Sequence, residues 1–122
     1  MAWEHRIDVP KRLVRVAFHG TLTDADLIDG DRALRDDPDF DPAYHQLMDL
    51  TDADGSAVTA EGLRALASLP PLFAPSARRA LVVQTDLGFG MGRMFELLRE
   101  GRAGEIRVFR DLQQAYDWLD LG

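Results

Sequence analysis

The apolar residues of this sequence follow two different spacings, which alternate along the chain. Residues 3–9 and 14–18 alternate apolar with polar side chains, and this period of two is typical of half-buried β-strands. Helical stripes then separate three further β-like runs, at residues 44–50, 79–85 and 105–109. Because parallel strands need crossover connections, this order predicts an α/β domain that starts with an antiparallel hairpin and continues with helical crossovers.

Capping residues mark where helices begin. Thr23, Thr59 and Asp111 each precede a helical stripe and are expected to be N-caps, because their side-chain oxygens can accept a backbone N–H. Before the last helix, another is expected to present one apolar face, formed by Met91, Met94, Phe95 and Leu98. We therefore expect one domain, residues 1–122, with a mixed five-stranded sheet and about four helices packed against it.

Charge and composition exclude several classes of partner. The formal net charge is −7 and the basic residues are scattered, whereas nucleic acids and anionic membranes are bound by clustered Lys and Arg. We therefore expect neither nucleic acid nor a membrane as a partner. The sequence has no cysteine and no apolar run near the ~20 residues that span a bilayer. Together with a charged N-terminus that does not resemble a signal peptide, this favours a cytoplasmic location.

The segment RALVVQTDLGFGMGR, residues 79–93, has the strand–glycine–helix order of a nucleotide-phosphate site. Gly88 and Gly90 fit the first two positions of G-x-G-x-x-G, but the third falls on Arg93, which cannot allow the close helix–strand approach of a glycine. A P-loop would need Lys followed by Ser or Thr, where this chain has Arg93 and Met94. We interpret the glycines as a flexible turn that tolerates left-handed backbone and lets a helix start close to the sheet. A bound anion or small ligand is the alternative.

The acidic segment at residues 50–61 follows part of the EF-hand spacing. Asp52, Asp54 and Glu61 occupy loop positions three, five and twelve. Position one, however, is Leu50, which has no oxygen for Ca²⁺, and the preceding element is β-like rather than helical. We interpret the segment as an ordinary turn, with adventitious weak metal binding as the alternative, and we expect no metal site.

The glycine and acidic segments are expected to meet at one edge of the sheet. If the third and fourth strands are parallel neighbours, the loops after them open at the carboxyl edge, where ligands bind in open α/β sheets. Three acidic side chains around Arg93 would repel a phosphate and give its guanidinium carboxylate partners, so Arg93 is predicted to tie the two loops together. The candidate ligand-binding residues at this edge are Asp52, Asp54, Asp86, Gly88, Gly90, Gly92 and Arg93.

No combination of residues predicts catalysis. His5, His19 and His45 lie far apart in the sequence, and no two of them have the spacing of metal ligands. The serines have no evident neighbouring base, and the G-x-S-x-G motif of a nucleophile elbow is absent. We therefore expect no enzyme, no catalytic residue and no cofactor.

Four segments of the chain resemble the SpoIIAA-like family of small bacterial proteins, which is of STAS and SEC14 type. The segments are MDLTDADG, TAEGLRAL, ARRALVVQTDLGFGMGRMFELL and VFRDLQQAYDWL. The most specific pieces are F-G-x-x-R-M-F at residues 89–95 and V-F-R-D-L-x-x-A-x-x-W-L at residues 108–119. The resemblance extends from about Val14 to Leu119 and implies a STAS-like sheet with helices packed against it.

The resemblance also bears on regulation and on lipids. STAS antagonists of anti-sigma factors carry Asp-Ser-Ser-Gly-Leu where a helix begins, and a kinase phosphorylates one serine. The matching residues here are Thr59-Ala60-Glu61-Gly62-Leu63, so the phosphoacceptor serine is lacking. Thr59 is explained as the helix cap and Glu61 as a first-turn acid, with mimicry of a phosphoserine by Glu61 as the alternative. SEC14-like carriers need a cavity for acyl chains, for which 122 residues leave little volume.

These observations favour a non-enzymatic, STAS-like interaction or regulatory module that acts through a protein partner or through its own dimer. Trp3, Trp118 and Leu121 lie near the two ends of the sequence and are expected to leave an apolar patch, and such patches often mark self-association. The alternative is a small-ligand-binding protein that uses the loops at the carboxyl edge of the sheet.

Overall fold

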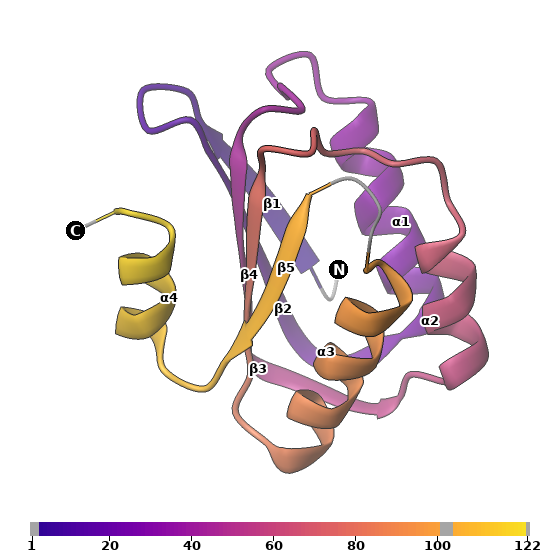
Figure 1. Ribbon diagram of the computed structural model, residues 1–122. Coiled ribbons are helices and arrows are strands. Elements are labelled where there is room, and N and C mark those ends of the chain that lie inside the picture. Colours follow the sequence, from indigo (N-terminus) through magenta and orange to yellow (C-terminus); the bar gives the residue numbers. More distant parts are fainter. Residues whose placement is uncertain (1–2, 101–103, 122) are drawn as a thin grey trace.

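The computed structural model describes residues 3–100 and 104–121, in which five strands form one sheet (Figure 1). The strands lie side by side in chain order and are β1 (Trp3–Asp8), β2 (Leu13–Thr23), β3 (His45–Ala57), β4 (Arg78–Val82) and β5 (Glu105–Phe109). The helices are α1 (Asp24–Arg35), α2 (Ala60–Ala67), α3 (Asp86–Leu98) and α4 (Leu112–Trp118). β1 is antiparallel to β2, and the other neighbouring pairs are parallel. The predicted mixed α/β fold is confirmed.

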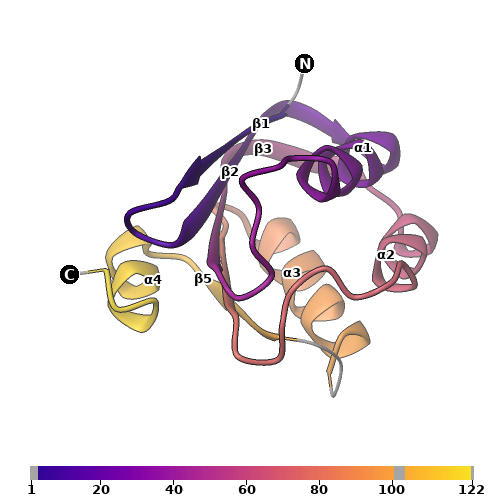
Figure 2. The same ribbon diagram turned by 90° about the horizontal axis from the view of Figure 1, so that it is seen from above.

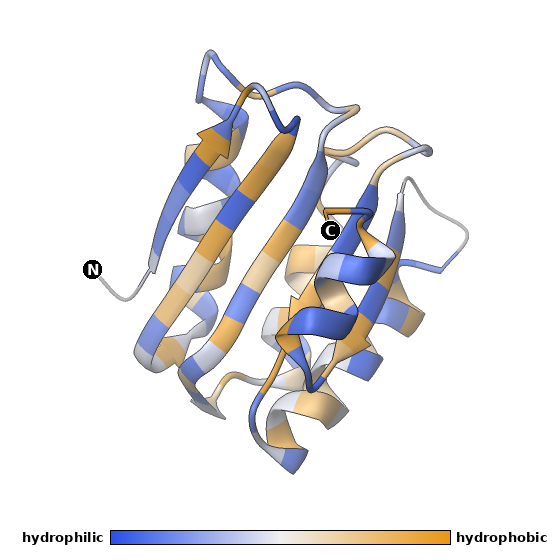
Figure 3. Cartoon of the chain, turned by 90° about the vertical axis from the view of Figure 1, so that its left-hand side faces the viewer, coloured by the Kyte–Doolittle hydropathy of each residue, from blue (hydrophilic) through white to orange (hydrophobic). Residues whose placement is uncertain are grey.

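The sheet separates two layers of helices. α1, α2 and α3 cover one face, and α4 lies against the other (Figure 1 and Figure 2). Successive residues of a strand point to opposite faces, so Leu81 of β4 packs in the core under α1–α3, whereas Ala80 and Val82 pack in the core under α4. The predicted apolar face of α3 packs in the first of these cores. Along the strands that α4 leaves uncovered, hydrophilic and hydrophobic residues alternate (Figure 3).

The three predicted N-caps are confirmed. Thr23 forms a capping box with Asp26: Asp26 N donates to Thr23 Oγ1 at 3.2 Å, and Thr23 N donates to Asp26 Oδ2 at 2.9 Å. Thr59 accepts one backbone N–H at the start of α2, and Asp111 accepts two at the start of α4. Thr85 caps α3 in the same way, although the sequence analysis does not identify it.

β3 is longer than the sequence predicts, and this changes the acidic segment. The strand extends over His45–Ala57, so Asp52 and Asp54 lie in it and not in a loop. They pair with the second half of β2, opposite His19 and Thr21. The predicted turn is wrong here because ladder pairing with β2 outweighs the low strand propensity of Asp and Gly. Within residues 3–100 and 104–121, no three His, Asp or Glu side chains are grouped so that they could hold a metal ion.

The predicted apolar patch does not form as one surface. Trp3 packs against the core under α1–α3, whereas Trp118 and Leu121 pack against the core under α4, on the other face of the sheet. The sheet therefore separates Trp3 from Trp118 and Leu121, and self-association stays a prediction. In the part of the chain that the structure describes, no helix has the length and apolar character needed to cross a bilayer.

Candidate functional site

The glycine segment after β4 belongs to a helix rather than to a turn. Gly88, Gly90 and Gly92 lie inside α3, and none of them has a positive φ. The prediction of a left-handed turn is wrong because Thr85 caps the helix almost directly after the strand: Thr85 Oγ1 accepts from Gly88 N at 2.9 Å. The N–H of Gly88, in the first turn of α3, thus has its hydrogen-bond acceptor within the chain itself.

The predicted close approach of this helix to the sheet is confirmed at two of the glycines. A Cβ on Gly88 would lie 3.3 Å from Val83 Cβ, and a Cβ on Gly92 would lie 3.0 Å from Val108 Cγ2. A Cβ on Gly90 would have no atom within 4 Å. Gly88 and Gly92 therefore let α3 pack closely on the sheet, whereas Gly90 has no such contact.

Arg93 does not tie the two segments together, so that prediction is wrong. Arg93 Nη1 donates to Glu96 Oε2 at 2.7 Å, one turn along the same helix. Asp86 instead accepts from Arg110 Nη2 at 2.8 Å. The acidic residues of the extended β3 and the glycines of α3 are thus not gathered around one guanidinium. Ligand binding by these seven residues stays a prediction.

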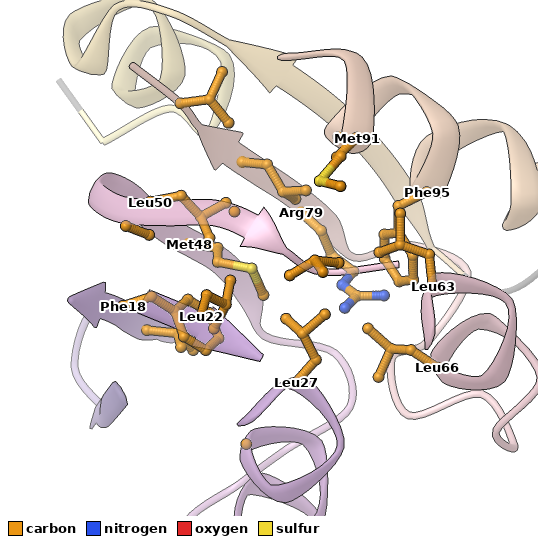
Figure 4. Close-up of a pocket in the computed structure, with 18 of the residues that line it drawn as sticks. Phe18, Leu22, Leu27, Met48, Leu50, Leu63, Leu66, Arg79, Met91 and Phe95 are labelled. Carbon is orange, nitrogen blue, oxygen red and sulfur yellow. The ribbon is translucent and has the colours of Figure 1, made fainter. Parts of the chain in front are cut away.

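A cavity of about 120 Å³ lies in the core between the sheet and the helices α1, α2 and α3 (Figure 4). Its wall is mainly aliphatic and aromatic and includes Phe18, Leu22, Met48, Leu63 and Phe95. Of the seven predicted ligand-binding residues, Gly88 and Gly92 belong to the wall. The exposed residues Gln84 and Thr85 also belong to it, so the cavity borders solvent at the carboxyl end of β4.

Arg79 brings a positive charge into this cavity. β4 places it directly opposite Gln46 of β3, and Arg79 Nε donates to Gln46 Oε1 at 3.0 Å. Both side chains are buried: Arg79 is 7% exposed and Gln46 is 2% exposed. In Figure 4 the guanidinium extends from β4 toward Leu27 and Leu63 at the centre of the cavity.

No carboxylate pairs with Arg79 among the described residues. Its Cζ lies 4.5 Å from the ring centroid of Phe73 and 6.0 Å from that of Phe95, within the range of cation–π contacts. Burial and, next, the charge of Arg99 lower the pKa of Arg79 from its ordinary value to about 10. The guanidinium therefore stays charged at neutral pH. Buried charges without an ionic partner are costly and are concentrated at functional sites.

The other ionisable groups of the wall, Asp31, Arg35 and Arg99, have partners of their own. Asp31 Oδ1 accepts from Arg35 Nε at 2.6 Å within α1. Arg99 Nη1 donates to the carbonyl oxygens of Ala67 and Leu69, at 2.8 Å and 3.4 Å. Asp31 is thus paired with Arg35, four residues along the same helix, and makes no ion pair with Arg79.

Arg79 is not predicted as a site residue because the segment RALVVQT has the pattern of one apolar strand. The signal that could have found it is the period of two. Arg79 stands two residues before Leu81, so both face the same side of the sheet, which is the side that three helices cover. Arginine is almost never fully buried unless it is paired, so an inward-facing arginine in such a strand indicates a binding site.

Comparison with known proteins agrees with this architecture. The chain is similar to the crystal structure of an uncharacterised protein of the DUF3478 family with a SpoIIAA-like fold, from Shewanella loihica PV-4. The TM-score is 0.62 at 21% sequence identity, and the match covers 97% of this chain and 94% of that one. This chain has the SpoIIAA-like fold. The predicted resemblance is thus confirmed at the level of the fold, while no family model and no curated protein matches the sequence.

In this SpoIIAA-like fold, residues 59–63, which resemble the STAS phosphoacceptor segment, lie at the start of α2. A carboxylate of the same chain already binds there. Asp24 Oδ1 accepts from Thr59 N at 2.9 Å, and Asp24 Oδ2 accepts from Thr59 Oγ1 at 2.7 Å. These bonds lower the pKa of Asp24 from its ordinary value of 3.8. A Cβ on Gly62 would lie 2.1 Å from Asp24 Cγ, so this glycine leaves the room that the carboxylate needs.

Thr59 is expected to act as a structural cap in this SpoIIAA-like fold. Thr59→Ala should lower the free energy of unfolding by about 1 kcal/mol, the usual cost of losing an N-cap, whereas Thr59→Ser should retain it. Because the pKa of Asp24 is lowered in the folded chain, the contribution of its bonds is full above pH 3.8 and is lost as the pH falls below that value. Urea unfolding at pH 7 and in acid checks both statements. Equal stability of the Ala and Ser variants at pH 7 would contradict the cap.

Proposed function

We propose that this chain is a non-catalytic binding domain that holds a small, mostly apolar molecule in the cavity under α1, α2 and α3. The observation that carries the proposal is the cavity itself, with its volume of about 120 Å³ and its aliphatic and aromatic wall. Protein interiors are close-packed, and voids larger than a water molecule are few. A cavity of about 150 Å³ lined by Leu, Ile and Phe binds benzene, so this space suits a body near the size of one aromatic ring.

The chemistry of the wall supports binding rather than catalysis. The described residues that line the cavity include no His, Cys, Ser, Tyr, Lys or Glu, which are common nucleophiles and bases. Thr85 has a hydroxyl, but that oxygen caps α3, and Asp31 is bonded to Arg35. The wall therefore offers no pair of nucleophile and base, and the expected absence of enzymatic activity is part of this proposal.

The proposal places the ligand deeper than the sequence analysis does. The sequence favours loops at the carboxyl edge of the sheet as the ligand site, whereas the cavity starts beside Gly88 at this edge and extends along β4 as far as Arg79. A molecule bound between the sheet and three helices stabilises their packing increasingly as its concentration rises above the dissociation constant, which is how a regulatory module could respond to it. Binding of a protein partner and homodimer formation stay predictions.

The methionines of the chain give a local measurement of binding. Met48 and Met91 line the cavity, whereas Met94, also on α3, is not one of the wall residues. In protein with ¹³C-labelled methionine methyl groups, titration with toluene is expected to shift the Met48 and Met91 signals and to leave the Met94 signal nearly unchanged. The response should saturate, because the cavity has room for one ring.

A variant that fills the cavity provides the matched control. Ala53 belongs to the wall, so Ala53→Phe should place a ring in the space and abolish the toluene response. Ala65→Phe adds the same ring at an exposed position of α2 and should leave the response intact. If Met48 and Met91 do not respond in the unmodified chain, or if Ala53→Phe binds toluene equally well, the proposed function is wrong.

A further inference from the structure

The cation in the cavity wall has donors that the protein does not use. A guanidinium carries five N–H donors in a planar fork, and in Arg79 the Nε donates to Gln46 Oε1 at 3.0 Å. The terminal nitrogens Nη1 and Nη2 make no hydrogen bond to the described residues, and no carboxylate oxygen of those residues lies within 4.0 Å of the guanidinium. In Figure 4 these nitrogens point into the space between Leu27, Leu63 and Leu66. They therefore face whatever occupies the cavity.

The charges around Arg79 favour an anion. Arg99 and Arg35 contribute positive charge at this position, and Asp31 contributes negative charge. Asp31 is bonded to Arg35 at 2.6 Å, so the two largely offset each other. Arg79 itself makes no ion pair with the described residues and lies in an apolar surrounding, where electrostatic attraction to a bound anion is stronger than in water.

We infer that the molecule held in this cavity is a small carboxylate and that Arg79 binds its carboxylate group; the inference rests on the proposed function. The flat fork of a guanidinium matches the two oxygens of a carboxylate, and bidentate pairs of this kind are among the strong hydrogen-bonded contacts. The Nε of the guanidinium already donates to Gln46 Oε1. This leaves both terminal nitrogens for the two oxygens of the ligand.

The size and the wall of the cavity restrict the rest of the ligand. A volume of about 120 Å³ accepts a body near the size of benzene. Phosphate would lose the hydration of a second charge in a wall that is mainly aliphatic and aromatic, which is costly without further donors. An aromatic or short aliphatic monocarboxylate has a body of suitable size and only one negative charge. Its apolar body would lie under the helices and its carboxylate against Arg79.

Benzoate and benzyl alcohol are matched probes, because they share a ring and differ in charge. At pH 7 the unmodified chain is expected to bind benzoate at least about ten-fold more tightly than benzyl alcohol, since hydrogen bonds to charged groups are the stronger class. Titrations followed by the methyl signals of Met48 and Met91 give both affinities. Benzoate, but not benzyl alcohol, should also shift the ¹⁵N signal of Arg79 Nε.

Variants of the arginine identify the group that binds the charge. Arg79→Met should weaken benzoate binding by at least about ten-fold and should weaken the binding of benzyl alcohol much less. Arg107→Met removes an exposed arginine of β5 and should change neither affinity. If Arg79→Met does not fold, Gln46→Leu/Arg79→Met removes both buried partners together and serves for the same comparison.

The outcomes separate this inference from the proposed function. Equal affinities of the unmodified chain for benzoate and benzyl alcohol overturn the inference, as does a benzoate affinity that the Arg79 variants do not lower. In both cases the proposed function stands if toluene still shifts the methyl signals of Met48 and Met91. Benzoate binding that persists in Ala53→Phe also overturns the inference, because the carboxylate then lies outside the cavity.

Discussion

Replacing Gln46 and Arg79 together is expected to make the unliganded chain more stable. The variant Gln46→Leu/Arg79→Met exchanges a buried cation and its acceptor for apolar side chains of similar size. Such exchanges of buried ionic groups often raise the free energy of unfolding, by about 1–4 kcal/mol. The pKa of Arg79, which is lowered to about 10 mainly by burial, agrees with this direction, because burial disfavours the charged form.

The single variants should separate the effect of the buried charge of Arg79 on the free energy of unfolding from that of its acceptor Gln46. Gln46→Leu alone leaves the guanidinium buried without its acceptor and should lower the free energy of unfolding by about 1.5–3 kcal/mol. Arg79→Met alone removes the charge but leaves Gln46 Oε1 without its donor, so its stability should lie between that of Gln46→Leu and that of the double variant. Urea unfolding of the four proteins at pH 7 completes the double-mutant cycle. A Gln46→Leu variant as stable as the unmodified chain would contradict this account.

The gain in the double variant should also depend on pH in a definite direction. The folded pKa of Arg79 is lower than the unfolded one, so from about pH 10 upward the unfolded chain binds more protons and the unmodified chain gains stability as the pH rises. The advantage of the double variant is therefore full below about pH 10 and shrinks above it. If the difference in free energy of unfolding between the double variant and the unmodified chain stays constant as the pH is raised through 10, the charge of Arg79 is not the cause of that difference.

Most of the fold could be predicted because its signals are local. The alternation of spacings gives the order of strands and helices, and Thr23, Thr59 and Asp111 accept hydrogen bonds from backbone groups within three residues of themselves. The length of β3 could not be predicted in this way. Its second half is rich in Asp and Gly, and it is a strand because β2 continues beside it.

The cavity could not be predicted because it depends on contacts that are distant in sequence. Arg79 and its acceptor Gln46 are 33 residues apart, and the burial of both depends on which face of the sheet three helices cover. Charge and the shared edge of the sheet predict carboxylate partners for Arg93 in both loops, whereas its partner is Glu96, three residues away on the same helix. Charge patterns therefore identify candidate groups, and the packing of the elements decides which of them meet. The expected lack of room for a large lipid is consistent with a volume of about 120 Å³.

Two glycines of α3 are expected to respond in opposite directions to the same substitution. Gly90→Ala adds a methyl group where no atom lies within 4 Å, so it should raise the free energy of unfolding by about 0.5–1 kcal/mol through helix propensity. Gly92→Ala places the same group 3.0 Å and 3.1 Å from the two methyl carbons of Val108. It should lower the free energy of unfolding by about 1–3 kcal/mol, the usual effect of overpacking.

Val108 provides the control for this comparison. Its β-branched side chain is restricted at χ1 and cannot easily turn away from an added methyl group, so the contact is relieved only if α3 moves off β5. In a Val108→Ala background the two glycine variants should therefore become similar, and urea unfolding should give a coupling energy between positions 92 and 108 but none between 90 and 108. Equal effects of Gly90→Ala and Gly92→Ala in the unmodified chain would mean that the close packing of α3 on β5 does not depend on Gly92. Because Gly92 also lines the cavity, that result would further imply a wall that can yield to larger ligands.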